Sequence, residues 1–363
     1  MIGRQHYAGV RARLVGRVSA LMGLVLFIAP EAQSEEMAAR GESEGLTLTA
    51  RTSLYYTNDV ALFSATRRMS LNADPTQPAI DQFLVGQGAD GVYEPTLEIS
   101  KAWSSDYGKT KLQMKGDGYV FMEKTAFTHG TMQAGISQEF DETNALHLSY
   151  YLSPDLYLGK NIDRQPQYGG GIPSAVGGLV LAPEQLSSQI GVLRYDFRLN
   201  EAIEIQWLAR VGERRYDPQF SERNLTFWTI GPHLETHLTP TLSWVVGYHF
   251  ERGIAAGHQS STVQDDVSYD NNFISTEFEW MVAPKDTLSL GLHYELNYWL
   301  SNSPQDDRYK TSESTYQADL VLKHQIDSDF LVYGGTQYGY RVLSPDGAMT
   351  SIFNLSMGVQ SRF

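Results

Sequence analysis

The residues from 353 to 363 alternate between apolar and polar side chains without a break. In an extended strand, one face would carry Phe353, Leu355, Met357 and Val359, and the other would carry Asn354, Ser356, Gly358, Gln360 and Arg362. This period of two predicts a β-strand with one apolar and one polar face. We expect a membrane barrel, because an open sheet edge is not stable in lipid and the last strand must close against the first.

The same residues carry a recognisable ending. A polar residue, then glycine, then spaced hydrophobic residues up to a terminal aromatic resemble the C-terminal signal of bacterial outer-membrane β-barrels. Ser356, Gly358, Val359 and Phe363 match that assembly signal, while Ser361 stands where an aromatic or apolar residue is usual. The resemblance implies insertion by the barrel-assembly machinery, contact with outer-membrane lipid and lipopolysaccharide, and location in the outer membrane of a Gram-negative bacterium.

Residues 1–34 read as a cleaved secretory signal peptide. Arg4, Arg11, Arg13 and Arg17 precede an apolar run over 18–29, and small residues follow at 32–34. The run is too short for a membrane-spanning helix, which needs about 20 apolar residues. We therefore expect a short periplasmic N-terminal segment over 35–45 and a transmembrane barrel over 46–363.

Composition excludes several other classes. The chain has no cysteine, so disulfides and thiolate metal sites are excluded. The signal carries four arginines and one glutamate, so the remaining chain has 24 basic and 41 acidic residues and a formal charge of −17. That charge argues against a nucleic-acid partner. Aromatic residues make up 12% of the chain, enough to supply girdles at both membrane interfaces.

Alternation recurs along the whole chain. It predicts fourteen strands at 46–57, 95–104, 109–122, 128–140, 145–153, 187–199, 202–215, 225–238, 241–252, 272–282, 287–300, 314–326, 330–342 and 349–363. Their connections alternate between short turns and longer loops, the longest over 58–94 and 154–186. The fold class is therefore all-β, a transmembrane antiparallel up-and-down barrel of about 14 strands with periplasmic N- and C-termini. A soluble sandwich also alternates, but rarely has so many strands of uniform length with aromatic residues at both ends.

The polar faces of these strands should line the lumen. The candidate pore-lining residues are Arg194, Arg198, Arg210, His233, Glu235, His237, His249, Glu251, Glu277, Glu279, His293 and Glu295. The arginines gather on two strands and the glutamates on four others. Such arcs either set up a transverse field across a water-filled lumen or are solvated polar positions whose signs cluster by chance.

Some polar residues are also candidates for metal or catalytic sites, and a simple role in lining the lumen is the alternative for each. His233, Glu235 and His237 lie about 6.5–7 Å apart along one strand face, so a metal would need ligands from neighbouring strands. The acid pairs Asp265-Asp266 and Asp306-Asp307 fall in loops and suit either calcium or solvent. His324 is the one histidine expected to face outward, and no serine matches it. We predict no metal, no cofactor and no enzymatic activity.

An apolar loop over 168–181 is the segment beyond the wall that looks most functional. The constriction candidates within it are Tyr168, Gly170, Ile172, Val176 and Leu179. An exposed loop should not be this apolar. The loop would be buried by folding into the pore, by packing on the barrel rim, or by contact with a partner subunit.

These features favour a passive diffusion channel for small hydrophilic solutes or ions that mildly prefers cations. The short N-terminal segment is expected to leave no room for a plug. A second interpretation is the barrel of an export or surface-assembly system. Tyr55-Tyr56-Thr57-Asn58-Asp59 resembles the Tyr-Asp-x-Asn-Val segment of barrels that help to assemble surface lipoproteins or polysaccharide. A third interpretation is a structural or adhesive barrel with a closed lumen. The oligomeric state is not predicted.

Overall fold

The structure is a computed structural model that describes residues 45–71, 74–80, 84–163, 181–258 and 265–363. The predicted signal peptide and residues 35–44 lie outside this range, so those boundaries stay predictions. The described residues form β1 (Gly45–Thr57), α2 (Val60–Arg67), β2 (Asp90–Ser105), β3 (Gly108–Phe121), η2 (Thr125–Phe127), β4 (His129–Glu139), β5 (Asn144–Ile162), β6 (Leu181–Asn200), β7 (Ile203–Tyr216), η3 (Pro218–Arg223), β8 (Leu225–Thr239), β9 (Leu242–Ala255), β10 (Tyr269–Ala283), β11 (Asp286–Trp299), β12 (Ser312–Gln325), β13 (Phe330–Ser344) and β14 (Ala348–Arg362).

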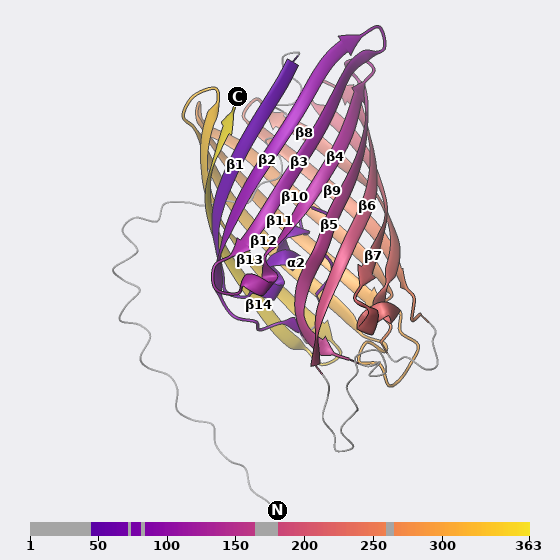
Figure 1. Ribbon diagram of the computed structural model, residues 1–363. Coiled ribbons are helices and arrows are strands. Elements are labelled where there is room, and N and C mark those ends of the chain that lie inside the picture. The colour runs from indigo at the N-terminus through magenta and orange to yellow at the C-terminus, as the bar shows by residue number, and fades with distance from the viewer. Residues whose placement is uncertain (1–44, 72–73, 81–83, 164–180, 259–264) are drawn as a thin grey trace, which may run out of the picture.

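The fourteen strands close into one antiparallel barrel (Figure 1). Each strand pairs with its neighbours in the chain, and β14 pairs with β1 in a register that runs from Thr49 opposite Arg362 to Thr57 opposite Asn354. Leu48 and Phe363 extend the seam, since each backbone amide donates to the other carbonyl. The predicted all-β up-and-down barrel is confirmed, as is its closure by the residues up to Phe363.

Several strands run further than the alternation predicts, most of all β5, β6 and β2. β6 begins at Leu181 instead of 187. β5 continues to Ile162 instead of ending at 153, because the sheet absorbs Pro154 and Asp155 by shifting register between Ser153 and Leu156. A second shift follows between Tyr157 and Gly159. β2 begins at Asp90, before Pro95, and its pairing with β3 skips Glu94 and Pro95 without changing register. Bulges of this kind let a strand keep its direction past a residue that breaks the ladder.

Each strand presents apolar side chains outward, and its inward side chains are polar except where apolar clusters, with residues such as Tyr119, Phe121 and Ile190, lie toward the loop end. In β11, Leu292 is 44% exposed on the outer face, whereas Glu295 is 2% exposed on the inner face. Exposed aromatic residues lie near both strand ends, with Trp103 and Trp280 near one end and Trp228 and Tyr298 near the other. An apolar outer band between two aromatic girdles is the pattern of a wall that faces lipid. None of the helices in the described residues is long and apolar enough to cross a membrane.

The two ends of the barrel differ. Gly45, Phe363 and the short turns 106–107, 140–143, 201–202, 240–241, 284–285 and 326–329 lie at one end, here called the turn end (Figure 1). The opposite end, here called the loop end, carries the connections 58–89, 122–128, 163–180, 217–224, 256–268, 300–311 and 345–347. The predicted alternation of short and longer connections is therefore present, and the connection over 58–89 turns into the barrel.

Candidate functional site: a lumen closed by the first long connection

All twelve candidate pore-lining residues lie on the strand face opposite the apolar outer side chains. His233, His249, Glu277, His293 and Glu295 are buried. His237 is exposed at the turn end, and the other six, Arg194, Arg198, Arg210, Glu235, Glu251 and Glu279, are intermediate in exposure. Whether they line a conducting path stays a prediction, since five of them are covered from the inside.

The connection over 58–89 is called the inner segment from here on, and its described residues, 58–71, 74–80 and 84–89, lie inside the barrel (Figure 1). The segment begins with α2, whose N-cap is Asp59. The Asp59 carboxylate accepts hydrogen bonds from the amides of Ala61, Gly86 and Gln87 at 3.2, 2.7 and 3.2 Å. The amide of Val60 donates to the carbonyl of Gly88 at 3.1 Å. One carboxylate therefore holds both ends of the segment, which leaves the wall and returns to it at adjacent points.

The first half of the inner segment packs an apolar face on the wall. The Phe63 ring, 1% exposed, meets the rings of Tyr55, Tyr119 and Phe121 at centroid distances of 5.4, 6.5 and 5.8 Å in edge-to-face geometry. Burying one such side chain contributes about 1.5–3 kcal/mol. Val60, Ala61, Ile80 and Leu84 join the same cluster together with Leu156 and Leu158 of β5 and Leu186 of β6.

Two consecutive arginines cross the lumen from the end of α2. Arg67 donates to Glu94 of β2 at 2.7 Å and lies over the rings of Tyr55, Phe63 and Tyr119. Arg68 pairs with Glu295 of β11, on a different part of the wall. The side chains of Glu94 and Glu295 are 0% and 3% exposed. Removing one partner of a buried ion pair typically costs about 3–5 kcal/mol, because the other charge is left buried and uncompensated.

The rest of the inner segment reaches the far wall through hydrogen bonds and through a second apolar cluster, in which Met69 and Leu71 pack on Phe273 of β10. The amide of Leu71 donates to Glu277 of β10 at 3.2 Å. The Ser188 hydroxyl on β6 donates to the carbonyl of Thr76 at 2.9 Å. Arg214 of β7 donates to the carbonyls of Pro75 and Gln77, and Arg341 of β13 donates to that of Ile80. The segment thus contacts strands all round the barrel and closes the lumen at its own level.

A serine, a histidine and an aspartate lie in hydrogen-bond sequence behind Leu71. The Ser275 hydroxyl is 2.8 Å from Nδ1 of His293, and Nε2 of His293 is 2.7 Å from Asp319. Ser275 is 0% exposed and also donates to Glu277, which holds the amide of Leu71. The sequence-based prediction of a serine–histidine pair was limited to His324 and did not include Ser275 and His293. Its burial under the inner segment favours a positioning role, because a nucleophile must reach its substrate.

The histidines that were weighed as metal ligands separate in space. His233 pairs with His249 of β9 through their Nε2 atoms, 2.6 Å apart. His237 instead bonds the hydroxyl of Ser243 at the turn end. Within the part of the chain that the structure describes, no three His, Cys, Asp or Glu side chains gather as a metal site.

The acidic loop residues that were weighed for calcium bind arginines. Asp265 accepts two hydrogen bonds from Arg223, at 2.6 and 2.9 Å, and one from Arg308 at 2.7 Å. Arg223 also pairs with Glu184 of β6 at 2.9 Å, so these ion pairs link three connections at the loop end to one another and to β6. Burial raises the pKa of the neighbouring Glu222 to about 7, against an ordinary value of 4.5, and the nearby charge of Asp265 adds to the effect.

Two of the predictions concern segments that could fill the lumen. The predicted constriction loop, Tyr168 to Leu179, lies outside the described residues. The expectation that no plug is present is wrong, because the first long connection supplies one. The sequence does carry a signal for this helix. Asp59 is an N-capping residue, and the apolar run Val60-Ala61-Leu62-Phe63 follows it in a connection predicted to be a loop. The same apolar test that singled out the loop over 168–181 applies there.

A closed barrel with an apolar outer band, two aromatic girdles and a polar interior defines the class of protein. The chain is an outer-membrane β-barrel, with the fold of porins and channels of Gram-negative bacteria.

Comparison with known proteins gives only distant structural similarities. No protein-family model and no curated protein matches the chain. Among solved structures, a monoaromatic hydrocarbon channel, CymD, aligns with a TM-score of 0.47 and 10% identity over 89% of both chains. OmpT of Vibrio cholerae aligns with a TM-score of 0.43 and 13% identity over 89% of this chain and 99% of that one. A mutant of the monoaromatic hydrocarbon channel TodX gives 0.46 and 11% over 88% and 90%. Similarity this low carries no argument about solute or mechanism.

Proposed function

We propose that this barrel is an outer-membrane channel for small hydrophilic solutes or ions, and that the inner segment is its gate. The observation that carries the proposal is the pair of arginines at the end of α2. Arg67 and Arg68 bind Glu94 and Glu295 on separate parts of the wall, so one short helix closes the lumen by two ion pairs. When the helix moves and water enters, the separated charges regain their hydration, which offsets part of the cost of breaking the two pairs.

The polar side chains of the strands that face the inner segment are consistent with a conducting channel. Beyond the apolar cluster at α2, Met69 and Leu71 pack against Phe273 of β10. The polar side chains of Ser188, Glu277 and Arg341 bond to the backbone of the segment. A wall lined by polar side chains stays wettable once the segment withdraws, as the lining of a channel must. A barrel with a purely structural role has no need for charged side chains beneath a segment that already fills it.

The orientation of the barrel follows the usual rule for outer-membrane proteins. Short turns face the periplasm and longer loops face outward. The turn end, with Gly45 and Phe363, is then periplasmic, and the inner segment enters the lumen from the extracellular side. We propose that the gate therefore responds to conditions outside the cell.

Deleting residues 60–87 and joining Asp59 to Gly88 through Asn-Gly tests the gate. The amide of Val60 bonds the carbonyl of Gly88, so the ends to be joined already lie together and a tight hairpin can replace the segment. We expect single-channel conductance in planar bilayers to rise several-fold above that of the full chain.

Two controls make the result specific. The deletion variant must keep heat-modifiable migration in gels, which shows that the barrel has folded. Excising residues 169–178 separately tests the predicted constriction loop. A folded deletion variant with unchanged conductance would contradict the gate. A rise confined to the 169–178 excision would place the constriction in that loop instead.

A further inference from the structure

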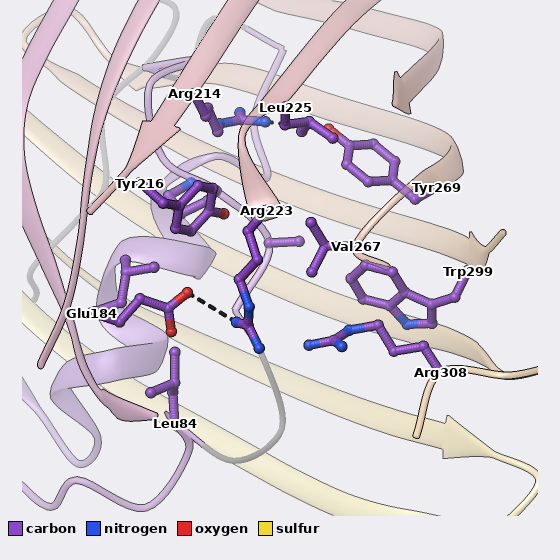
Figure 2. Close-up of a pocket in the computed structure, with 13 residues that line it drawn as sticks. Leu84, Glu184, Arg214, Tyr216, Arg223, Leu225, Val267, Tyr269, Trp299 and Arg308 are labelled. Carbon is purple, nitrogen blue, oxygen red and sulfur yellow. Dashed lines mark hydrogen bonds and ion pairs between the residues drawn. The ribbon is translucent and has the colours of Figure 1, made fainter. Parts of the chain in front are cut away.

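A small cavity of about 30 Å³ lies between the inner segment and the wall near the loop end (Figure 2). Its floor is Pro78, Ala79 and Leu84 of the inner segment. Its walls are apolar and aromatic, from β5, β7, β8, β11 and the residues that lead into β10: Leu158, Tyr216, Leu225, Val267, Tyr269 and Trp299. Three arginines, Arg214, Arg223 and Arg308, and one acid, Glu184, also line it. Small-molecule sites are usually apolar pockets of about 300–1,000 Å³ with a few convergent polar groups, so a ligand here has to displace part of the lining.

Two of the three arginines are neutralised by acids of the chain. Figure 2 shows Arg223 reaching Glu184, and Arg223 also makes two short hydrogen bonds to Asp265. Arg308 binds the same Asp265 at 2.7 Å and lies 3.5 Å from Asp306. These distances are those of charge-assisted bonds. Neither side chain has need of a further anion.

Arg214 differs from both. It is 5% exposed, and its terminal nitrogens donate to the hydroxyl of Tyr269 at 3.2 Å and to the carbonyls of Pro75 and Gln77 at 3.2 and 3.4 Å. Its Nε is buried without a hydrogen-bond acceptor, and no carboxylate forms an ion pair with it within the described residues. The guanidinium also lies over the ring of Phe227, 4.4 Å from the ring centroid. A guanidinium binds a planar anion at about 2.7–2.9 Å, whereas the partners that the described residues offer Arg214 are all neutral.

We propose that this cavity binds a small amphipathic carboxylate, with its carboxylate on Arg214 and its apolar body among Leu225, Val267 and the ring of Trp299. A carboxylate matches the fork of the guanidinium in two parallel hydrogen bonds, which neither a carbonyl nor a hydroxyl can offer. The aromatic rings around the cavity suit a flat or short aliphatic body, and benzoate is the simplest probe of that class.

The inference rests on the proposed gate and adds a chemical signal to it. The nitrogen of Arg214 that the carboxylate takes is the one that now holds the carbonyls of Pro75 and Gln77. A cavity of about 30 Å³ also holds a few waters at most, so the body of the ligand displaces Pro78 and Leu84 as it enters. The carboxylate therefore acts as an opener from the loop end, and need not be the ion that the channel favours.

Binding to the purified, folded full chain tests the site directly. Benzoate, benzyl alcohol and acetate are titrated at neutral pH, following tryptophan fluorescence and heat. We expect saturable binding of benzoate, with benzyl alcohol and acetate each about tenfold weaker or more, because each lacks one half of the recognised group. The fluorescence change should vanish in Trp299→Phe while the heat of binding remains.

Variants of the arginine separate charge from shape. Arg214→Gln should weaken benzoate binding about tenfold or more, and Arg214→Lys should recover only part of it, because a lysine lacks the fork. Arg198→Gln is the matched control, since Arg198 is a lumen arginine at the turn end, paired with Glu204 at 3.6 Å. It should bind benzoate as the unmodified chain does, and all variants must stay heat-modifiable.

The outcomes distinguish this inference from the gate. Equal binding of benzoate and benzyl alcohol, or full binding by a folded Arg214→Gln variant, would overturn the carboxylate site even if deleting residues 60–87 opens the channel. Binding that depends on Arg214, together with a benzoate-induced rise in channel open time, supports both. Binding that depends on Arg214 with no effect of the deletion on conductance keeps the site and removes the gate.

Discussion

Single residues decide how the inner segment is held, and these are the residues that sequence reasoning saw least clearly. Arg67 and Arg68 are neighbours in the chain, yet their partners are Glu94 and Glu295. Nothing local in the sequence distinguishes the two arginines, because their difference comes from which wall each one reaches. Glu295 was predicted to face a water-filled lumen and instead meets a cation from the first long connection.

Glu222 should make the packing at the loop end depend on pH. Its pKa is about 7 in the folded protein against 4.5 ordinarily, so folding favours the protonated form. The stabilisation is therefore complete below about pH 4.5 and is lost as pH rises through about 7. The charges that face it are Asp265, Asp163 and Arg223.

The amide of Gly257, which donates to the carbonyl of Glu222 at 2.7 Å, reports on this packing. We expect its hydrogen-exchange protection factor to be higher at pH 5.5 than at pH 7.5. Glu222→Gln keeps the neutral form at both values and should remove the Glu222 part of the difference. An unchanged pH dependence in that variant would assign the effect to the other loop acids.

At the scale of elements, strands were predictable and the inner segment was not. Period-two alternation located all fourteen strands, because one face of each must meet lipid along its whole length. It failed at Pro154 and Asp155, where a bulged strand continues with Asp155 at a φ of 50°. It also failed for α2, which has eight residues and takes its stability from the tertiary contacts of residues such as Phe63. Short helices held by tertiary contacts leave little periodic signal.

The pairing of β13 with β14 offers a test of strand packing at Gly358. A Cβ on Gly358 would lie 2.3 Å from the ring of Tyr333, whose hydroxyl bonds Ser53 of β1 at 2.7 Å. Gly358→Ala must push that ring away from the seam, and we expect a loss of about 1–3 kcal/mol in unfolding free energy.

Unfolding in urea after refolding into detergent measures this loss, and it does so without the assembly machinery. Gly116→Ala is the matched control, because a Cβ there meets nothing within 4 Å. We expect the control to unfold like the unmodified chain. Equal stability of the Gly358 and Gly116 variants would restrict Gly358 to its predicted role in the assembly signal.

At the scale of the whole molecule, the proposed gate and the predicted preference for cations are linked, because both depend on the charges inside the lumen. Arg67 and Arg68 place two positive charges inside a lumen that also holds Glu94, Glu277 and Glu295. Withdrawing the inner segment exposes these three acids and removes both arginines. The predicted mild cation preference should therefore be stronger in the open channel.

Reversal potentials in a salt gradient test this link. The variant that lacks residues 60–87 should prefer cations more than the full chain does at pH 7.5. Replacing Glu295 and Glu277 by glutamine within that variant should lower the preference again. An anion preference in the deletion variant would mean that Arg194, Arg198 and Arg210 line the narrowest point.

The inner segment also spans the junction between β1 and β14, the one pair of adjacent strands that are not consecutive in the chain. Asn58 exchanges hydrogen bonds with the backbone of Phe353, and Thr66 accepts one from Asn354 at 3.2 Å, so residues that follow β1 are tied to β14. The seam between these strands pairs fewer residues than β1 pairs with β2. The segment thus acts as an additional tie between β1 and β14. A pore that opens by releasing this tie lacks it while it conducts. Heat or force should therefore separate β1 from β14 first in the open form.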